Sequence, residues 1–97
     1  MKLYWQLTRR GQRLILNFEN ETHPEEVGGV RKTKSGFDAF AKTFGYDPGR
    51  AQKGFSTMEE AKTFVESFSP WTLFEGGADL TVDAEVHPDP QSDKSHN

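Results

Sequence analysis

Residues 36–70 have the sequence GFDAFAKTFGYDPGRAQKGFSTMEEAKTFVESFSP, and this stretch decides which fold the chain is predicted to adopt. In its first part, apolar residues recur at the spacing of one helical face, at Phe37, Phe40, Ala41 and Phe44. Ser35 precedes this run as a helix-start signal, and Gly45 and Pro48 follow it as stop signals. Together these features predict a helix over residues 36–44.

The second part of the stretch predicts another helix, over residues 57–68. Ser56 followed by Glu59, or Thr57 followed by Glu60, forms a capping box that satisfies the first free N–H groups of a helix. The apolar side chains that form one stripe along this helix are Met58, Ala61, Phe64, Val65 and Phe68. A serine-proline pair ends the helix, because the residue before a proline disfavours helical backbone.

Two strands are predicted before the helices. Residues 3–8 and 13–18 both alternate apolar and polar side chains with a period of two, which is typical of half-buried strands. The polar residues 9–12 between them contain one glycine and predict a hairpin turn. Residues 19–29 are acidic, with a proline and two glycines, and predict a loop that leads into a short strand over residues 30–33.

Two further strands are predicted after the helices, over residues 71–75 and 79–86, joined across the glycine pair 76–77. The second of them alternates in the manner of an antiparallel strand with one solvated face. Trp71 is predicted to pack in the core, since a small domain needs its large rings inside. From residue 87 to residue 97 nothing is apolar, which predicts a disordered polar tail.

The predicted architecture is a single α+β domain over residues 1–86, followed by the tail 87–97. It has two layers: a mostly antiparallel sheet of four or five strands, and two amphipathic helices on one face of that sheet. The element order is β-β-(β)-α-α-β-β. Eight Phe, two Trp and two Tyr supply large buried areas from few positions, which offsets the low apolar content of 33%.

Composition excludes several classes of function. The chain has no Cys, which rules out disulfides, thiolate metal sites and thiol catalysis. No stretch approaches the roughly 20 apolar residues that a membrane-spanning helix needs. The N-terminus has no apolar run long enough for a signal peptide, so we expect a cytoplasmic protein without a membrane partner.

No constellation of residues points to catalysis, to a cofactor or to a metal. The serines lack a G-x-S-x-G setting, and the glycine pair 28–29 is too short for a phosphate-binding loop. The carboxylate pair Glu59-Glu60 lies in the first turn of a predicted helix, where the helix dipole favours negative charge. His23 stands among acids in a predicted loop, and one His without Cys does not form a zinc site unaided. We therefore expect a protein that is not an enzyme.

Charge is distributed unevenly along the chain. Residues 1–53 carry ten Lys and Arg against six Asp and Glu, a net charge of +4, whereas residues 54–97 carry two against nine, a net charge of −7. The candidate polyanion-binding residues, called the basic set below, are Arg9, Arg10, Arg13, Arg31, Lys32 and Lys34, with Tyr4 near enough to stack on a base. The acids of the last predicted hairpin could dock on a basic partner, or fold back on the basic set and screen it.

One stretch of the chain, from Gly36 to Val65, resembles the small hybrid-binding, viroplasmin-like domain at the N-terminus of some ribonucleases H. The shared features are an aromatic-led helix, a proline after it, and a Lys-x-Phe before a capped Glu-Glu-Ala helix, at Phe37, Pro48, Lys53, Phe55 and Ser56 through Ala61. The resemblance implies binding of RNA-containing duplexes. The chain departs from the family where a tryptophan and a cysteine usually open the first helix, since it has Phe37 and Phe40 there.

The sequence leads to two functional hypotheses. The first is a small binding or regulatory domain that acts through contact with another protein. The second is a nucleic-acid-binding domain that uses the basic set on the N-terminal hairpin and the 31–34 segment. The positions of the two Trp and two Tyr rings test the second hypothesis. Exposed rings beside the basic set favour nucleic acid, and buried rings favour an ordinary solvated surface there.

Overall fold

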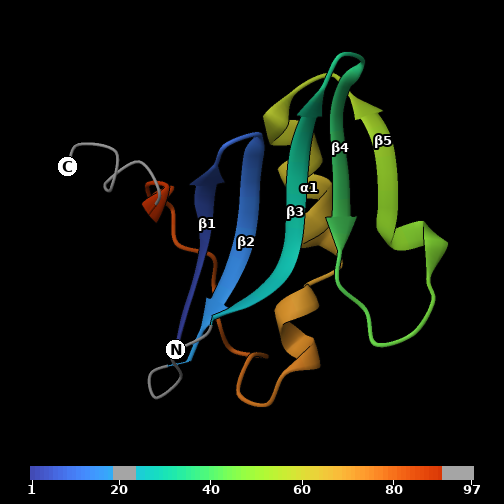
Figure 1. The fold of residues 1–97 in the computed structure, drawn as a ribbon. Coiled ribbons are helices and arrows are strands. Elements are labelled where there is room, and N and C mark those ends of the chain that lie inside the picture. The colour runs from blue at the N-terminus through green and yellow to red at the C-terminus, as the bar shows by residue number, and fades with distance from the viewer. Residues whose placement is uncertain (19–23, 91–97) are drawn as a thin grey trace.

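The computed structural model describes residues 1–18 and 24–90, and in this part of the chain five strands form one antiparallel sheet (Figure 1). In chain order and in spatial order they are β1 (Lys2–Thr8), β2 (Gly11–Asn17), β3 (Glu25–Thr33), β4 (Gly36–Ala41) and β5 (Ala51–Phe55). The α-helix of this part is α1 (Met58–Ser67), and the 3-10 turns are η1 (Pro48–Arg50) and η2 (Pro70–Leu73). The predicted α+β class with an antiparallel sheet is confirmed.

The N-terminal hairpin is confirmed as well. β1 pairs with β2 along its whole length, from Lys2↔Asn17 to Thr8↔Gly11. Strand alternation places Leu3 and Trp5 of β1 in the core beneath α1, as their spacing predicts.

The predicted helix over residues 36–44 is wrong, because residues 36–41 form strand β4 and the chain then enters a loop. The apolar residues of this segment fit a period of two as well as a period of 3.6. β4 pairs with β3 from Gly28↔Ala41 to Thr33↔Gly36 and so satisfies the backbone N–H and C=O groups of β3. A short isolated helix would offer no such partners and would carry the cost of helix nucleation.

The turn before β4 explains why Ser35 does not start a helix. The hydroxyl of Thr33 donates a hydrogen bond to the carbonyl of Gly36 at 3.1 Å and accepts one from the backbone N–H of Ser35 at 3.2 Å. Gly36 has a φ of +133°, a backbone conformation that favours glycine. The hydroxyl-rich segment therefore closes a tight turn between β3 and β4.

Two strands differ from the prediction in extent. β3 begins at Glu25, inside the segment 19–29 that is predicted as a loop; residues 19–23 of that segment lie outside the described residues. β5 is not predicted at all. Four of its five residues are exposed, so no alternation of apolar and polar side chains marks it in the sequence.

Helix α1 confirms the second predicted helix. The side chain of Thr57 accepts a hydrogen bond from the backbone N–H of Glu60 at 3.1 Å, and its hydroxyl lies 3.1 Å from the Glu60 carboxylate, which is the predicted capping box. Ala61 and Val65 are fully buried against the sheet. After the helix, Ser69 adopts a left-handed conformation with a φ of 47°, directly before the proline that opens η2.

The predicted strands over residues 71–75 and 79–86 are wrong. Residues 70–73 form η2, in which the Thr72 hydroxyl donates a hydrogen bond to the carbonyl of Ser69 at 2.8 Å. The later residues follow the outer edge of β1 with isolated backbone hydrogen bonds, from Asp83 N–H to Leu3 O, from His87 N–H to Trp5 O and from Leu7 N–H to His87 O. The chain packs against β1 as far as His87, the first residue of the predicted tail, and residues 91–97 lie outside the described part.

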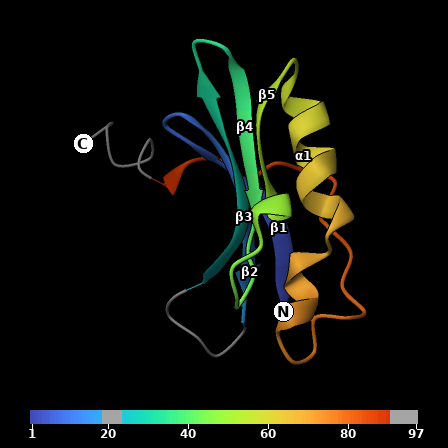
Figure 2. The same cartoon turned by 90° about the vertical axis from the view of Figure 1, so that its right-hand side faces the viewer.

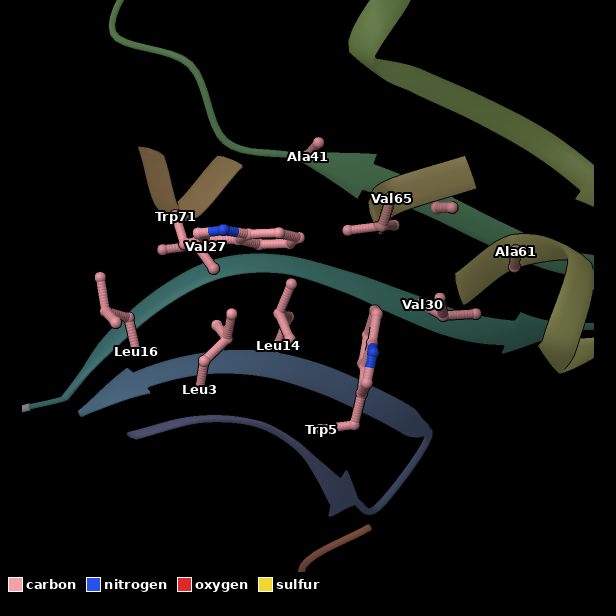
Figure 3. Packing of buried hydrophobic residues seen from close by; sticks show 11 residues of the cluster. Leu3, Trp5, Leu14, Leu16, Val27, Val30, Ala41, Ala61, Val65 and Trp71 are labelled. Atoms are coloured by element: carbon pink, nitrogen blue, oxygen red, sulfur yellow. The ribbon is translucent and has the colours of Figure 1, made fainter. Parts of the chain in front are cut away.

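The hydrophobic core lies between the sheet and the layer formed by α1 and η2 (Figure 3). Its buried members from the strands and from the second layer are Leu3, Trp5, Leu14, Leu16, Val27, Val30, Ala39, Ala41, Ala61, Val65 and Trp71. Trp71 is buried there, as the sequence predicts. α1 contacts β3, β4 and β5, so one face of the sheet is covered by the helical layer.

The segment along the edge of β1, residues 83–87, is held by two contacts of the Asp83 carboxylate. Asp83 Oδ1 accepts the backbone N–H of Glu85 at 3.0 Å, and Asp83 Oδ2 lies 3.1 Å from His87 Nε2. These two contacts, the backbone bond first, lower the pKa of the Asp83 carboxyl below its usual 3.8. The His87 ring also stacks on Tyr4 with a centroid separation of 3.9 Å.

Asp83→Asn is expected to destabilise the fold in a pH-dependent way. A carboxyl whose pKa is lowered by folding contributes stability above its unfolded pKa, and that contribution is lost as pH falls through the folded pKa. The difference in unfolding free energy between wild type and Asp83→Asn should therefore shrink as pH falls from about 5 toward about 2. Denaturant unfolding at several pH values measures it, with exposed Glu75→Gln as the control. A difference that grows in acid would contradict the assignment.

Candidate functional site

Helix α1 lies on one side of the sheet, and the opposite face is not covered by it (Figure 2). A groove of about 590 Å³ runs across this face and is lined by residues from all five strands. We call it the open-face groove. Its floor contains Gly29 of β3 and Phe40 of β4, which are paired in the strand register.

Phe40 is the exposed aromatic ring in this groove, with 41% of its surface accessible. Its neighbours in β4, Ala39 and Ala41, are buried beneath α1, so strand alternation turns Phe40 to the opposite face. The ring lies over Gly29, because a Cβ added to that glycine would come within 2.8 Å of Phe40 Cε1. A glycine at this position therefore leaves the space in which the Phe40 ring lies against the sheet.

Cations surround the ring. Arg10, Arg31 and Lys53 line the groove, and none of them forms a side-chain hydrogen bond or ion pair with another described residue. In the strand register Arg31 is two residues along β3 from Gly29, the partner of Phe40, which makes it a diagonal neighbour of the ring. Diagonal neighbours lie roughly 7–8 Å apart, within the reach of a long side chain.

A fourth cation, Arg13, is held in place. Its guanidinium donates two hydrogen bonds to Gln6 Oε1, at 3.0 and 2.8 Å, and lies 4.0 Å from the carboxylate of Glu26. The second carboxylate in the groove belongs to Asp38, which accepts the backbone N–H of Gly54 at 3.1 Å. The groove thus has four cations against two carboxylates, whereas the whole chain carries a net charge of −3.

The structure divides the basic set between the two sides of one end of the sheet. Arg10, Arg13 and Arg31 line the open-face groove. Arg9 and Lys32 line a smaller groove with Phe37 and Met58, on the side of the sheet that α1 covers, and Arg10 borders both grooves. The two hairpin ends are tied together, since the backbone N–H of Lys32 donates to the carbonyl of Arg10 at 2.7 Å. Lys34 lies in the turn between β3 and β4.

Tyr4 is not placed to stack on a ligand. It is 7% exposed and its ring is covered by His87. Both tryptophans are buried, and the other tyrosine, Tyr46, is 94% exposed in the loop between β4 and η1. The Trp and Tyr rings therefore do not meet the criterion that favours nucleic acid. The exposed aromatic ring that lines the open-face groove is Phe40.

The acids of the C-terminal segment do not screen the basic set in the described part of the chain. The ion pairs found there are Arg13–Glu26, Lys42–Glu25, Arg50–Asp47 and His87–Asp83. The acidic segment runs along the outer edge of β1, and Asp83 takes its partners from within that segment.

Two residues of the open-face groove, Phe40 and Lys53, are not among the candidate site residues predicted from the sequence. The helical spacing of Phe37, Phe40 and Phe44 places Phe40 in the core, and β5, which carries Lys53, has no pattern that predicts a strand. One signal was present in the sequence. The alternation of Phe37, Ala39 and Ala41 is also a strand period, and it puts Phe40 on the other face.

Within residues 1–18 and 24–90, no three His, Asp or Glu side chains converge as metal ligands. No helix in that part of the chain is long and apolar enough to cross a membrane.

Comparison of the chain with protein-family models, with curated proteins and with solved structures finds no match in any of the three. The first helix required by the resemblance to the hybrid-binding domain is strand β4 in this fold.

Proposed function

We propose that this chain is a non-catalytic binding domain and that its open-face groove binds nucleic acid through the phosphate backbone. The observation that carries the proposal is the set of unpartnered cations in the groove, Arg10, Arg31 and Lys53. Cations whose side chains form no ion pair with another described residue are available to an external polyanion. Each phosphate they contact releases counterions from the nucleic acid, which favours binding.

The geometry of the groove supports the same partner. Arginine presents a planar fork of donors that matches a phosphate, and two of the three unpartnered cations are arginines. Arg9, Lys32 and Lys34 at the same end of the sheet extend the positive charge beyond the groove. The acidic residues at the β1 edge would repel the same polyanion, so charge favours one orientation of the ligand on the protein.

The test is a titration of labelled oligonucleotides into the whole chain at about 50 and 200 mM salt. We expect binding at the lower salt, and an affinity that falls steeply as salt is raised. The absence of binding to any single- or double-stranded oligonucleotide at about 50 mM salt would overturn the proposal.

A second candidate is contact with another protein, and a different surface favours it. The loop between β4 and η1 exposes Phe44 at 69% and Tyr46 at 94%, on a part of the chain separate from the groove. Aromatic residues are over-represented among the side chains that dominate protein interfaces. In that case Phe44→Ala with Tyr46→Ala would abolish binding to a purified partner and leave oligonucleotide binding unchanged.

A further inference from the structure

We infer that the ligand of the open-face groove is a single strand, and that one of its unpaired bases stacks on the ring of Phe40. This inference rests on the proposed function and adds to it the state of the nucleic acid. The cations account for contact with phosphates, which duplexes and single strands share. An exposed ring among them has no partner on a duplex backbone, but it fits an unstacked base.

The placement of Phe40 is the first step of the argument. The ring has no aromatic neighbour and no cation over it among the described residues, in contrast to Phe74, which contacts Phe18, Phe44 and Lys42. Gly29 supports it from the sheet side, where an added Cβ would lie 2.8 Å from Cε1 and 3.4 Å from Cζ. A ring held on one side by backbone and accessible over 41% of its surface is a preorganised platform.

The arrangement of charge around the ring is the second step. Arg31 on β3 and Lys53 on β5 lie on the two strands that flank Phe40, and Arg10 lies beyond them at the hairpin end. A single nucleic-acid strand that crosses the sheet would place its phosphates on these cations and a base between them. This combination of a cationic groove with an aromatic platform is the general solution for single strands.

The shape of the site favours a single strand over the major-groove readout of an intact duplex. Proteins read a duplex by inserting a helix or a two-stranded ribbon into its major groove. The open-face groove is a hollow in the sheet, and α1 lies on the opposite side (Figure 2). A duplex on this face would present its phosphates to the rim and would leave Phe40 without a base to contact.

The experiment compares an oligothymidylate of about 12 nucleotides, an abasic strand of the same length and charge, and a blunt duplex. Wild type should bind oligothymidylate at least about tenfold more tightly than the abasic strand. Phe40→Ala should lower the affinity for oligothymidylate by roughly 5- to 150-fold and change the affinity for the abasic strand by less than about twofold. Tyr46→Ala, which removes an exposed ring elsewhere, should change neither.

Two more variants keep the test independent of folding. Phe40→Trp adds an indole in the groove, and its fluorescence should be quenched by oligothymidylate but not by the abasic strand. Gly29→Ala keeps the ring and displaces it, so it should reduce the preference for the base-containing strand. Circular dichroism establishes that each variant is folded before it is titrated.

The outcomes separate this inference from the proposed function. Failure of wild type to bind any of the three ligands would overturn both. Binding of all three with equal affinity, and equal losses in Phe40→Ala, would leave phosphate binding in place and overturn the stacking of a base. Tighter binding of the duplex than of oligothymidylate would also overturn it.

Discussion

The double variant Arg31→Ala/Lys53→Ala is expected to bind single-stranded oligonucleotides roughly 10- to 100-fold more weakly than wild type at about 50 mM salt. Both side chains line the open-face groove, and neither forms a side-chain hydrogen bond or ion pair with another described residue. Each phosphate contact on a single strand contributes about 0.7 to the slope of log affinity against log salt, so the slope should fall by about 1.4. Fluorescence anisotropy over a salt series measures both quantities.

A charge-matched control separates local contacts from net charge. The variant Lys42→Ala/Lys62→Ala also removes two positive charges, but from outside the groove. Lys42 pairs with Glu25, and Lys62 lies over the ring of Trp5. We expect the salt slope of this control to match that of wild type. Equal losses in both double variants would contradict a specific site and indicate a response to overall charge alone.

Trp5→Ala is expected to destabilise the fold by about 3–5 kcal/mol, the usual cost of removing a large buried ring. Trp5 is 2% exposed and lies in the core between β1 and the helical layer (Figure 3). Its Nε1–H also donates a hydrogen bond to Glu66 Oε2 of α1 at 2.8 Å, which connects the edge of the sheet to the helix. Urea unfolding followed by circular dichroism gives the change in free energy.

Two further variants test the origin of that loss. Trp5→Phe keeps an aromatic ring but loses the donor to Glu66, so it should cost clearly less than Trp5→Ala. Leu7→Ala changes a residue of the same strand that is 44% exposed and should cost less than about 1 kcal/mol. A Trp5→Ala variant as stable as Leu7→Ala would show that the core is not organised as described.

The elements that could be predicted from the sequence are those in which one periodicity is unambiguous. The hairpin of β1 and β2 carries Leu3, Trp5, Leu14 and Leu16 at a strand period of two, and α1 combines a capping box at Thr57 with an apolar stripe. In both cases the local sequence signals and the burial of apolar side chains favour the same structure. The tertiary contacts of the fold therefore agree with the prediction.

The elements that were predicted wrongly are those whose structure is decided by a partner strand. Residues 36–41 satisfy both a helical and a strand period, and the pairing with β3 selects the strand. Residues 79–86 alternate like a strand, but the segment makes only isolated hydrogen bonds with β1, through the Asp83 N–H and through the N–H and carbonyl of His87 just after it. Local sequence does not encode which edge a segment will meet.

The candidate site likewise contains residues that the sequence identifies and residues that only strand pairing brings together. The arginines of the site could be identified from their clustering along the chain, because charge is visible without a fold. Phe40 and Lys53 could not be assigned to one surface until β4 and β5 were placed side by side. Tyr4 was assigned to the site from its proximity in the sequence, yet the C-terminal segment brings His87 over its ring.

The most direct test of the account is the mapping of backbone amide chemical shifts on ¹⁵N-labelled protein during titration with oligothymidylate. The account predicts that the largest chemical-shift changes occur on the face opposite α1, at Arg31, Phe40 and Lys53. The chemical shifts of the α1 amides should not change. Changes that cluster on α1 or in the loop around Tyr46, or no change at saturating oligonucleotide, would contradict it.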